Sequence, residues 1–256
     1  MSMDEVLIED RGAVRYLTLN RPEKRNALND ELVGALKAAL ADADENETLR
    51  AVVIRGAGKD FCSGADLSAL QKIAGASYED NLEDAHNLAE LFALPRKMRI
   101  PVIAAVHGRA LAGGCGLATA CDLVLATETA RFGYPEVKIG FVPAIVTAFL
   151  RRNIGEKRAF ELVTQGFEFT ARQALEFGLV NRVFGEETFD VEVGNYCSVY
   201  ENISPTAVSL TKDLLYGMDA LAFEESIELG TETNVEARMS EDCQRGIAKF
   251  LEKPAR

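Results

Sequence analysis

The sequence predicts an α/β fold with a mostly parallel sheet and a helical C-terminal third. Strand-like and helical segments alternate in the first half, as residues 14–20, 29–43 and 49–54 illustrate. This order is typical of parallel sheets with crossover helices. From residue 143 onward almost every segment has helical periodicity, and residues 180–184 form the last short strand. A chain of 256 residues, 48% of them hydrophobic, is long enough to bury a sizeable core.

The first elements are a hairpin, a helix and a buried strand. Residues 14–20 are rich in β-formers and follow a turn-like Asp-Arg-Gly at 10–12, which predicts an opening hairpin. Asn29 offers a helix cap, and the apolar residues that follow recur at helical spacing as far as Ala43. Residues 49–54 form a nearly continuous apolar run, so we expect a strand buried on both faces.

The same unit recurs before the chain becomes helical. We expect a helix over 78–97, a strand over 102–106, a glycine-rich loop into a short helix that ends near 121, and a strand over 123–126. Later helices are expected over 171–177, 191–201, 206–216, 220–238 and 241–251. No internal repeat or long linker interrupts this order.

The charge balance argues against nucleic acid as a partner. The chain has 28 Lys+Arg against 40 Asp+Glu and a formal net charge of -12. Such a surface repels a phosphate backbone, so any polyanionic ligand needs a local basic patch.

The cysteines and the apolar runs indicate a cytoplasmic protein. The five cysteines are odd in number and widely spread, without a C-x-x-C pair, which favours reduced thiols. The N-terminal residues carry charges and do not resemble a signal peptide. The uncharged stretch 110–121, as long as any in the chain, is too short and glycine-rich to span a membrane. We therefore expect no membrane association.

Several catalytic motifs are missing. The sequence lacks the nucleophile elbow, the P-loop, the zinc-protease helix and the dinucleotide-binding fingerprint. Only two histidines are available. His86 lies among acidic residues on a predicted helix and is expected to be solvated or ion-paired, whereas His107 ends a strand and is expected to form a structural hydrogen bond.

Two loops of small residues carry the functional signal. Residues 61–67 follow one predicted strand, and residues 108–116 follow the next. In a parallel sheet both loops lie at the carboxyl ends of their strands, where ligands bind. Backbone N–H groups from two such loops can form an oxyanion hole. Tight packing of strand against helix explains either loop taken alone, and this alternative stays open.

The order of several short motifs resembles the crotonase superfamily, the enoyl-CoA hydratase/isomerase family, over nearly the whole chain. The motifs are Asn20-Arg21-Pro22 through Leu28, Phe61 to Leu67, Pro101 to Val106 leading into Gly113-Gly114, Ala120 to Leu123, Phe132 to Glu136 with Gly140, and Ser240 to Pro254. Each motif is weak alone, and their joint order and spacing support the resemblance.

The resemblance implies a crotonase-like α/β spiral of ββα units. The spiral is expected over residues 1–187, and a helical oligomerisation region over residues 188–256. It also implies assembly as a homotrimer or as a homohexamer made of two trimers.

An acyl-CoA thioester substrate is also implied. The backbone N–H groups of Ala65 and Gly113 are expected to bind the thioester oxygen. These bonds strengthen as negative charge develops there, so they stabilise an enolate. The resemblance implies no metal and no redox cofactor, since coenzyme A is part of the substrate, and it suggests a role in fatty-acid metabolism.

Residues of five segments are expected to contact the substrate. They are Lys24, Arg25, Ala27 and Leu28 beside the ADP part, Ala65 and Leu67 along the pantetheine, and Lys249 and Lys253, which reach the 3'-phosphate of a neighbouring subunit's ligand. Gly64, Asp66, Gly113, Gly114 and Pro135 complete the expected substrate contacts. Asp66 is interpreted mainly as a helix cap. A solvated surface is the alternative for every lysine and arginine in this set.

The catalytic carboxylates decide the reaction. Family hydratases use two glutamates around a water molecule, and Glu136 matches the second of them. The first position falls on Gly116, so one carboxylate is missing. Glu128 and Glu161 are considered as replacements, although surface positions are expected for both. An exposed Glu136 paired with Lys138 is the alternative to a catalytic role.

We predict an enoyl-CoA hydratase that adds water across the 2,3 double bond through an enolate. The alternatives are a Δ3,Δ2-enoyl-CoA isomerase that uses Glu136 alone, and a non-catalytic acyl-CoA-binding homologue. Residues 140–146 resemble relatives that act on branched or carboxylated enoyl-CoAs such as methylglutaconyl-CoA.

Overall fold

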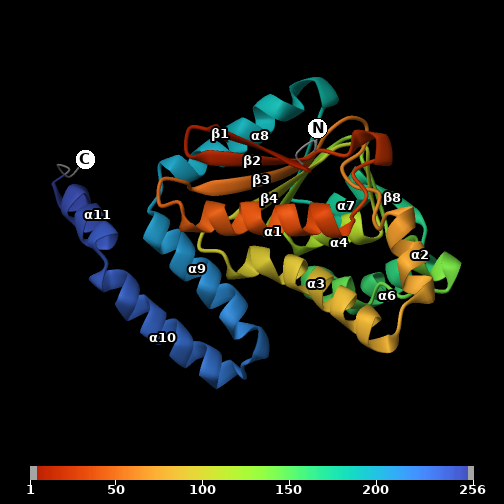
Figure 1. Ribbon diagram of the computed structural model, residues 1–256. Helices are drawn as coiled ribbons and strands as arrows, with labels where there is room; N and C mark the ends of the chain where they lie inside the picture. The colour runs from red at the N-terminus through yellow and green to blue at the C-terminus, as the bar shows by residue number, and fades with distance from the viewer. Residues whose placement is uncertain (1–4, 253–256) are drawn as a thin grey trace.

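The computed structural model describes residues 5–252 and contains a large and a small β-sheet (Figure 1). The large sheet has six strands in the order β1-β2-β3-β4-β6-β9, and the small sheet has the order β5-β7-β8. The strands are β1 (Val6–Arg11), β2 (Val14–Leu19), β3 (Ala51–Gly56), β4 (Val102–Val106), β5 (Arg109–Leu111), β6 (Leu123–Thr127), β7 (Arg131–Gly133), β8 (Glu168–Thr170) and β9 (Arg182–Phe184).

Helices surround both sheets. They are α1 (Asp30–Glu45), α2 (Leu67–Gly75), α3 (Tyr78–Lys97), α4 (Gly113–Ala120), α5 (Ala144–Asn153), α6 (Glu156–Gln165), α7 (Ala171–Phe177), α8 (Phe189–Ser198), α9 (Pro205–Gly217), α10 (Phe223–Met239) and α11 (Glu241–Leu251). Short 3-10 turns are η1 (Pro22–Lys24), η2 (Pro135–Ile139), η3 (Glu186–Thr188), η4 (Val199–Glu201) and η5 (Met218–Ala220).

The expected hairpin and parallel strands are confirmed. β1 pairs antiparallel with β2, and β2, β3, β4, β6 and β9 are parallel neighbours. The strand β4 is buried at every residue, as its continuous apolar sequence predicts. Parallel strands end at one edge of the sheet, so the loops that follow β3 and β4 lie side by side.

The large sheet has a hydrophobic layer on each face. Val52 and Ile54 of β3 pack with residues of α1, α3 and α4, whereas Val53 points to the other face and packs with Val193 of α8. Figure 1 shows α1 and α3 below the sheet and α8 above it. Asn29 caps α1 by accepting a hydrogen bond from the N–H of Leu32 over 3.0 Å, as predicted.

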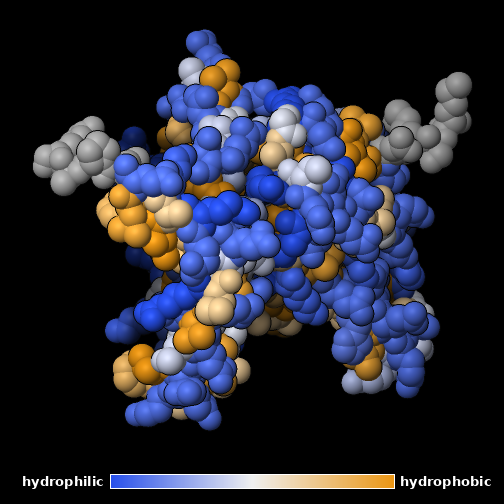
Figure 2. All heavy atoms as spheres, turned by 90° about the vertical axis from the view of Figure 1, so that its left-hand side faces the viewer, coloured by the Kyte–Doolittle hydropathy of each residue, from blue (hydrophilic) through white to orange (hydrophobic). Residues whose placement is uncertain are grey.

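The C-terminal arm, α10 and α11, extends away from the sheet (Figure 1). It exposes large hydrophobic side chains, among them Phe223, Met239, Phe250 and Leu251. Figure 2 views that side of the molecule, where hydrophobic residues lie at several places on a mostly hydrophilic surface. Soluble proteins rarely leave such residues grouped and uncovered, so the arm has the composition of a contact surface.

The small sheet and α2 are absent from the sequence predictions. Each strand of the small sheet has three residues, which is too short for alternation to be recognised. The predicted bounds of α3, β4, α7 and α11 are confirmed. All five cysteines are free thiols. Within residues 5–252, no helix has both the length and the hydropathy needed to cross a bilayer.

Candidate active site

The two loops of small residues meet beside the small sheet. Cys62 donates its N–H to the carbonyl of Arg109 over 3.1 Å and accepts from the N–H of Leu111 over 3.0 Å. This pairing brings α4 against the first loop. A Cβ atom on Gly114 would lie 2.2 Å from the carbonyl oxygen of Cys62, so only glycine permits this approach.

Gly64 forms the closest contact between the loops. It has a φ of +96°, and a Cβ atom there would lie 2.8 Å from the Cβ of Ala112 and 3.3 Å from the nitrogen of Gly113. A larger residue would therefore push the two loops apart. The small residues at these positions keep the backbones in contact.

Two backbone N–H groups remain unpaired at this junction. Leu28 donates to the carbonyl of Gly64 over 2.7 Å and accepts from the N–H of Asp66 over 2.9 Å, which leaves the N–H of Ala65 outside the pair. Gly113 is the first residue of α4, so its N–H has no intrahelical acceptor. Across residues 5–252, neither the Ala65 N–H nor the Gly113 N–H donates a hydrogen bond. Both remain available to a ligand.

Ala112, which the sequence did not mark as special, holds α4 in place with a strained backbone. Its φ of 48° and ψ of -125° lie in a region that alanine rarely adopts.

We predict that Ala112→Gly raises the free energy of unfolding by about 1 kcal/mol, because glycine adopts this conformation without strain. Urea denaturation measures the change, and a lower stability of the variant would show that the alanine side chain contributes more through packing than it costs in strain.

Glu136 is attached to the same junction by the small sheet. The carbonyl of Gly133 accepts from the N–H of Ala112 over 2.9 Å, and η2 begins two residues later. Between them, the buried hydroxyl of Tyr134 lies 2.6 Å from the hydroxyl of Thr119 on α4. The segment that carries Glu136 is thus hydrogen-bonded to both ends of α4.

The carboxylate of Glu136 is half-buried and incompletely paired. Its Oε2 atom is buried and has no hydrogen-bond partner within the described residues. Burial raises the pKa of Glu136 above its usual range.

Lys138 is exposed and forms no ion pair within residues 5–252, so the alternative of a Glu136–Lys138 surface pair is wrong. Burial raises the pKa of the Cys115 thiol to about 12, and the Glu136 charge adds to this shift, so the two side chains are electrostatic neighbours.

Hydrophobic side chains fill the space beside Gly116. A Cβ atom on Gly116 would lie 2.9 Å from Cε2 of Phe92 and 3.4 Å from the Cβ of Val146. These residues come from α3 and α5 and are almost completely buried. The side chains of Phe92 and Val146 therefore form a hydrophobic wall in the space that a glutamate side chain at residue 116 would need.

The two replacement acids are engaged elsewhere or exposed. Glu161 forms an ion pair with Arg158, and Glu128 is exposed after β6. Neither contributes to the raised pKa of Glu136, which arises from burial and is partly offset by a hydrogen bond with its own backbone. Of Glu128, Glu136 and Glu161, only Glu136 lies on the segment that is hydrogen-bonded to α4.

The segment predicted to contact the coenzyme joins the first loop. Leu28 and Ala27 are buried, and Leu28 pairs with Ala65. Lys24 and Arg25 are exposed immediately before them, and Nε of Arg25 lies 4.0 Å from Oδ2 of Asp60. A contact of either side chain with a phosphate stays a prediction. Asn26, which lies within this predicted segment, fixes the turn by donating from Nδ2 to the carbonyl of Asp60 over 2.7 Å.

Asp66 caps α2, as predicted. Its carboxylate accepts from the N–H of Ser68 over 3.0 Å and pairs with Arg21 at 2.8 Å. These bonds, first the one from Ser68, lower the pKa of Asp66. Leu67 begins α2 and Pro135 begins η2, so both lie at the ends of the loops that surround the junction.

Lys249 is not part of this junction within one chain. Lys249 lies on α11 at the left of Figure 1, whereas α2, which follows Ala65, lies at the right. Lys253 lies outside the described residues. A contact of these lysines with a neighbouring subunit's ligand stays a prediction.

The two histidines have the surroundings that the sequence predicts for them. His107 bonds the carbonyl of Gly58 through Nε2 over 3.0 Å, and His86 is exposed on α3, as predicted for both.

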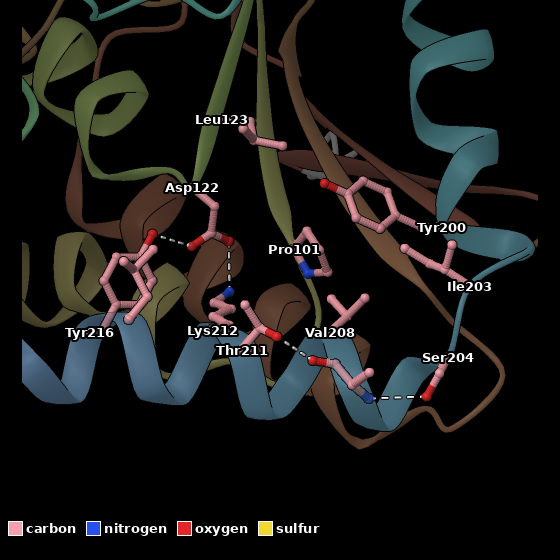
Figure 3. Close-up of a pocket in the computed structure, with 12 residues that line it drawn as sticks. Pro101, Asp122, Leu123, Tyr200, Ile203, Ser204, Val208, Thr211, Lys212 and Tyr216 are labelled. Carbon is pink, nitrogen blue, oxygen red and sulfur yellow. Dashed lines mark hydrogen bonds and ion pairs between the residues drawn. The ribbon is translucent and has the colours of Figure 1, made fainter. Parts of the chain in front are cut away.

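Figure 3 shows a cavity beside Asp122, and its volume is about 420 Å³. The carboxylate of Asp122 binds Lys212 at 2.6 Å and the hydroxyl of Tyr216 at 2.7 Å. Asp122 is structural, because it precedes β6 at the amino end of the sheet, away from the two loops.

Known proteins share this sequence and fold. A family model described as enoyl-CoA hydratase/isomerase matches residues 9–255. The chain belongs to the enoyl-CoA hydratase/isomerase family. It is a member of the crotonase superfamily, as the motifs predicted.

Individual members of the family are similar over nearly their full length. A putative enoyl-CoA hydratase of Thermus thermophilus is 40% identical over 95% of this chain and 96% of the relative. The 2,3-dehydroadipyl-CoA hydratase of Escherichia coli is 34% identical over 98% of this chain and 97% of that protein. The crystal structure of an enoyl-CoA hydratase of Mycobacterium smegmatis, 34% identical, superposes with a TM-score of 0.92 over 97% of this chain and 96% of its own.

Proposed function

We propose that this protein is a cytoplasmic enoyl-CoA hydratase that works with one catalytic carboxylate, Glu136. The observation that carries the proposal is the buried, unpartnered Oε2 of Glu136. Its segment is hydrogen-bonded to α4, whose first N–H, that of Gly113, is free like the N–H of Ala65 on the neighbouring loop. The names of the similar proteins support hydration as the reaction.

The N–H groups of Ala65 and Gly113 form the oxyanion hole. They bind the thioester oxygen and stabilise the negative charge that develops there when a nucleophile adds to the double bond. The N-terminus of α4 contributes its dipole to the same atom. Neither N–H has a competing acceptor within residues 5–252, which keeps both donors ready for the substrate.

One carboxylate is sufficient for the proton balance of hydration. Glu136 removes a proton from water while the oxygen forms a bond to C3, and the π electrons move to the thioester oxygen. The protonated Glu136 then returns that proton to C2 as the enolate collapses. The raised pKa of Glu136 suits both steps, because it makes the carboxylate a stronger base than an exposed glutamate.

The substrate is a branched or carboxylated enoyl-CoA in this proposal. Residues 140–146 follow η2 and differ from the Gly-Gly-Thr-rich version common in simple fatty-acyl hydratases. The Escherichia coli relative is named for a carboxylated enoyl-CoA, 2,3-dehydroadipyl-CoA, which supports this class.

Isomerisation is the second candidate because the wall beside Gly116 excludes a second acid. A single base can carry a proton between C2 and C4 of the acyl chain, and the side chains beside Gly116, Phe92 and Val146, are hydrophobic. This reaction would interconvert 3-enoyl-CoA and 2-enoyl-CoA thioesters without adding oxygen.

A turnover screen distinguishes the candidates. Purified protein is incubated with linear, branched and carboxylated 2-enoyl-CoAs and with a 3-enoyl-CoA, and the products are identified by mass spectrometry. Hydration predicts products 18 mass units above a 2-enoyl-CoA. Conversion of the 3-enoyl-CoA alone, with no mass change, would replace hydration by isomerisation.

The C-terminal arm is proposed to assemble the protein into a trimer or hexamer. Its exposed residues, including Phe223, Met239 and Phe250, need a hydrophobic partner surface. We expect light scattering to give three or six times the mass of 27.9 kDa. Ile247→Glu on the same arm should lower the measured mass, and a wild-type protein that is monomeric at micromolar concentration would contradict the assembly.

A further inference from the structure

Phe92 occupies a position that decides which side chains can stand at residue 116. It lies on α3, is 2% exposed, and belongs to the core beneath the large sheet. Its ring edge would lie 2.9 and 3.1 Å from a Cβ atom on Gly116. Cβ atoms essentially never lie within 3.0 Å of a non-bonded heavy atom, so any residue larger than glycine at position 116 requires Phe92 to move.

Residue 116 faces the junction described above. Gly113 and Gly116 are three residues apart on α4, and residues at this spacing share one helix face. The same face is in contact with the first loop, because a Cβ atom on Gly113 would lie 3.3 Å from Cδ1 of Leu28 and 3.9 Å from the Cα of Gly64. Phe92 therefore lies one helical turn from the free N–H of Gly113.

We propose that Phe92 is a specificity-determining residue that limits this site to one carboxylate. Its ring takes the volume that an acidic side chain at residue 116 would need, with Val146 closing the other side. The inference rests on the proposed function, since it names what restricts the acid–base chemistry of that site to Glu136. Residues 92 and 116 are then energetically coupled, so that the effect of a substitution at one depends on the residue at the other.

A double-mutant cycle tests this coupling. The variants are Gly116→Glu, Phe92→Ala and the double variant, and Phe92→Ala/Gly116→Gln is the matched control without a charge. Thermal unfolding of all variants reports whether the new glutamate side chain fits at residue 116, independently of any reaction. The pH dependence of 2-enoyl-CoA hydration reports whether a second carboxylate has joined Glu136.

The expected results follow from volume and charge. Gly116→Glu should unfold at a lower temperature than wild type, and most of that loss should disappear when Phe92 is also replaced by alanine. The double variant should hydrate its substrate at least about tenfold faster than the Gln control and show a second ionisation in its pH profile.

Two results would overturn the proposal. One is that Gly116→Glu destabilises the wild-type protein and the Phe92→Ala variant equally; the other is equal rates and pH profiles for the Glu and Gln double variants. If the double variant is insoluble, Phe92→Leu/Gly116→Asp is measured with the same expectations. A wild-type protein that turns over no enoyl-CoA would contradict the proposed function, while the unfolding cycle would still decide whether Phe92 restricts residue 116.

Discussion

Glu136→Gln is expected to lower the rate of enoyl-CoA turnover at least about a hundredfold, because the amide can neither accept the proton of water nor return it. Binding of the acyl-CoA should be nearly unchanged, since the oxyanion donors are backbone groups of other segments. The change is isosteric, so the fold is preserved. Steady-state kinetics and equilibrium binding of a saturated acyl-CoA measure the two effects separately.

Glu128→Gln and Glu161→Gln are the matched controls. Both residues carry the same charge as Glu136, but one is exposed and the other is paired with Arg158. We expect wild-type rates from both variants. A hundredfold loss in either control, or an unchanged rate in Glu136→Gln, would assign the base to a different residue.

The raised pKa of Glu136 has consequences for rate and for stability. The base must be ionised, so the rate should fall as the pH drops through a pKa above the ordinary value of 4.5. The folded state binds this proton more tightly than the unfolded state, so its contribution to stability is present at low pH and is lost as the pH rises through the raised pKa. Glu136→Gln should therefore melt at a higher temperature than wild type at neutral pH, and a lower melting temperature would contradict the burial argument.

Gly64→Ala is expected to lower the turnover rate about 10²- to 10³-fold, the usual effect of losing one oxyanion donor. The new Cβ atom would lie 2.8 Å from Ala112 and 3.0 Å from the carbonyl oxygen of Leu111, which forces the loops apart. The φ of +96° adds strain, and together these effects should cost about 1–3 kcal/mol of unfolding free energy. Kinetics at a temperature where the variant is folded measures the rate effect.

Gly34→Ala is the control for this substitution. Gly34 is exposed within α1, and a Cβ atom there would meet nothing within 4 Å. We expect an unchanged rate and a gain of up to about 1 kcal/mol in unfolding free energy, since alanine favours helices. A Gly64→Ala enzyme as active as the Gly34→Ala enzyme would contradict the contact between the loops as a requirement for activity.

Much of the fold was predictable because its elements carry strong local signals. Both α3 and β4 were located from the sequence: β4 follows Pro101 as a continuous apolar run, and the start of α3 has a capping box at Ser77 and Asp80 in the structure. The three strands of the small sheet have no such signal. Their pairing depends on residues far apart in the chain, for example Phe132 with Phe169.

The site was predictable only in part. The glycine-rich loops and Glu136 were identified from motifs, but the wall beside Gly116 was not. Phe92 precedes Gly116 by 24 positions and is one of many apolar residues on its helix, so no local pattern marks it. The strained backbone of Ala112 and the unpaired oxygen of Glu136 are likewise properties of tertiary packing.

Oxygen labelling is the most direct test of the central claim that Glu136 activates water at an oxyanion-stabilised thioester. The protein is incubated with a 2-enoyl-CoA in water enriched in oxygen-18, and the mass of the product is measured by mass spectrometry. We predict a 3-hydroxyacyl-CoA that carries one labelled oxygen with wild-type protein, and almost none with Glu136→Gln. No labelled product from any linear, branched or carboxylated 2-enoyl-CoA, or equal labelling by both proteins, would contradict the account.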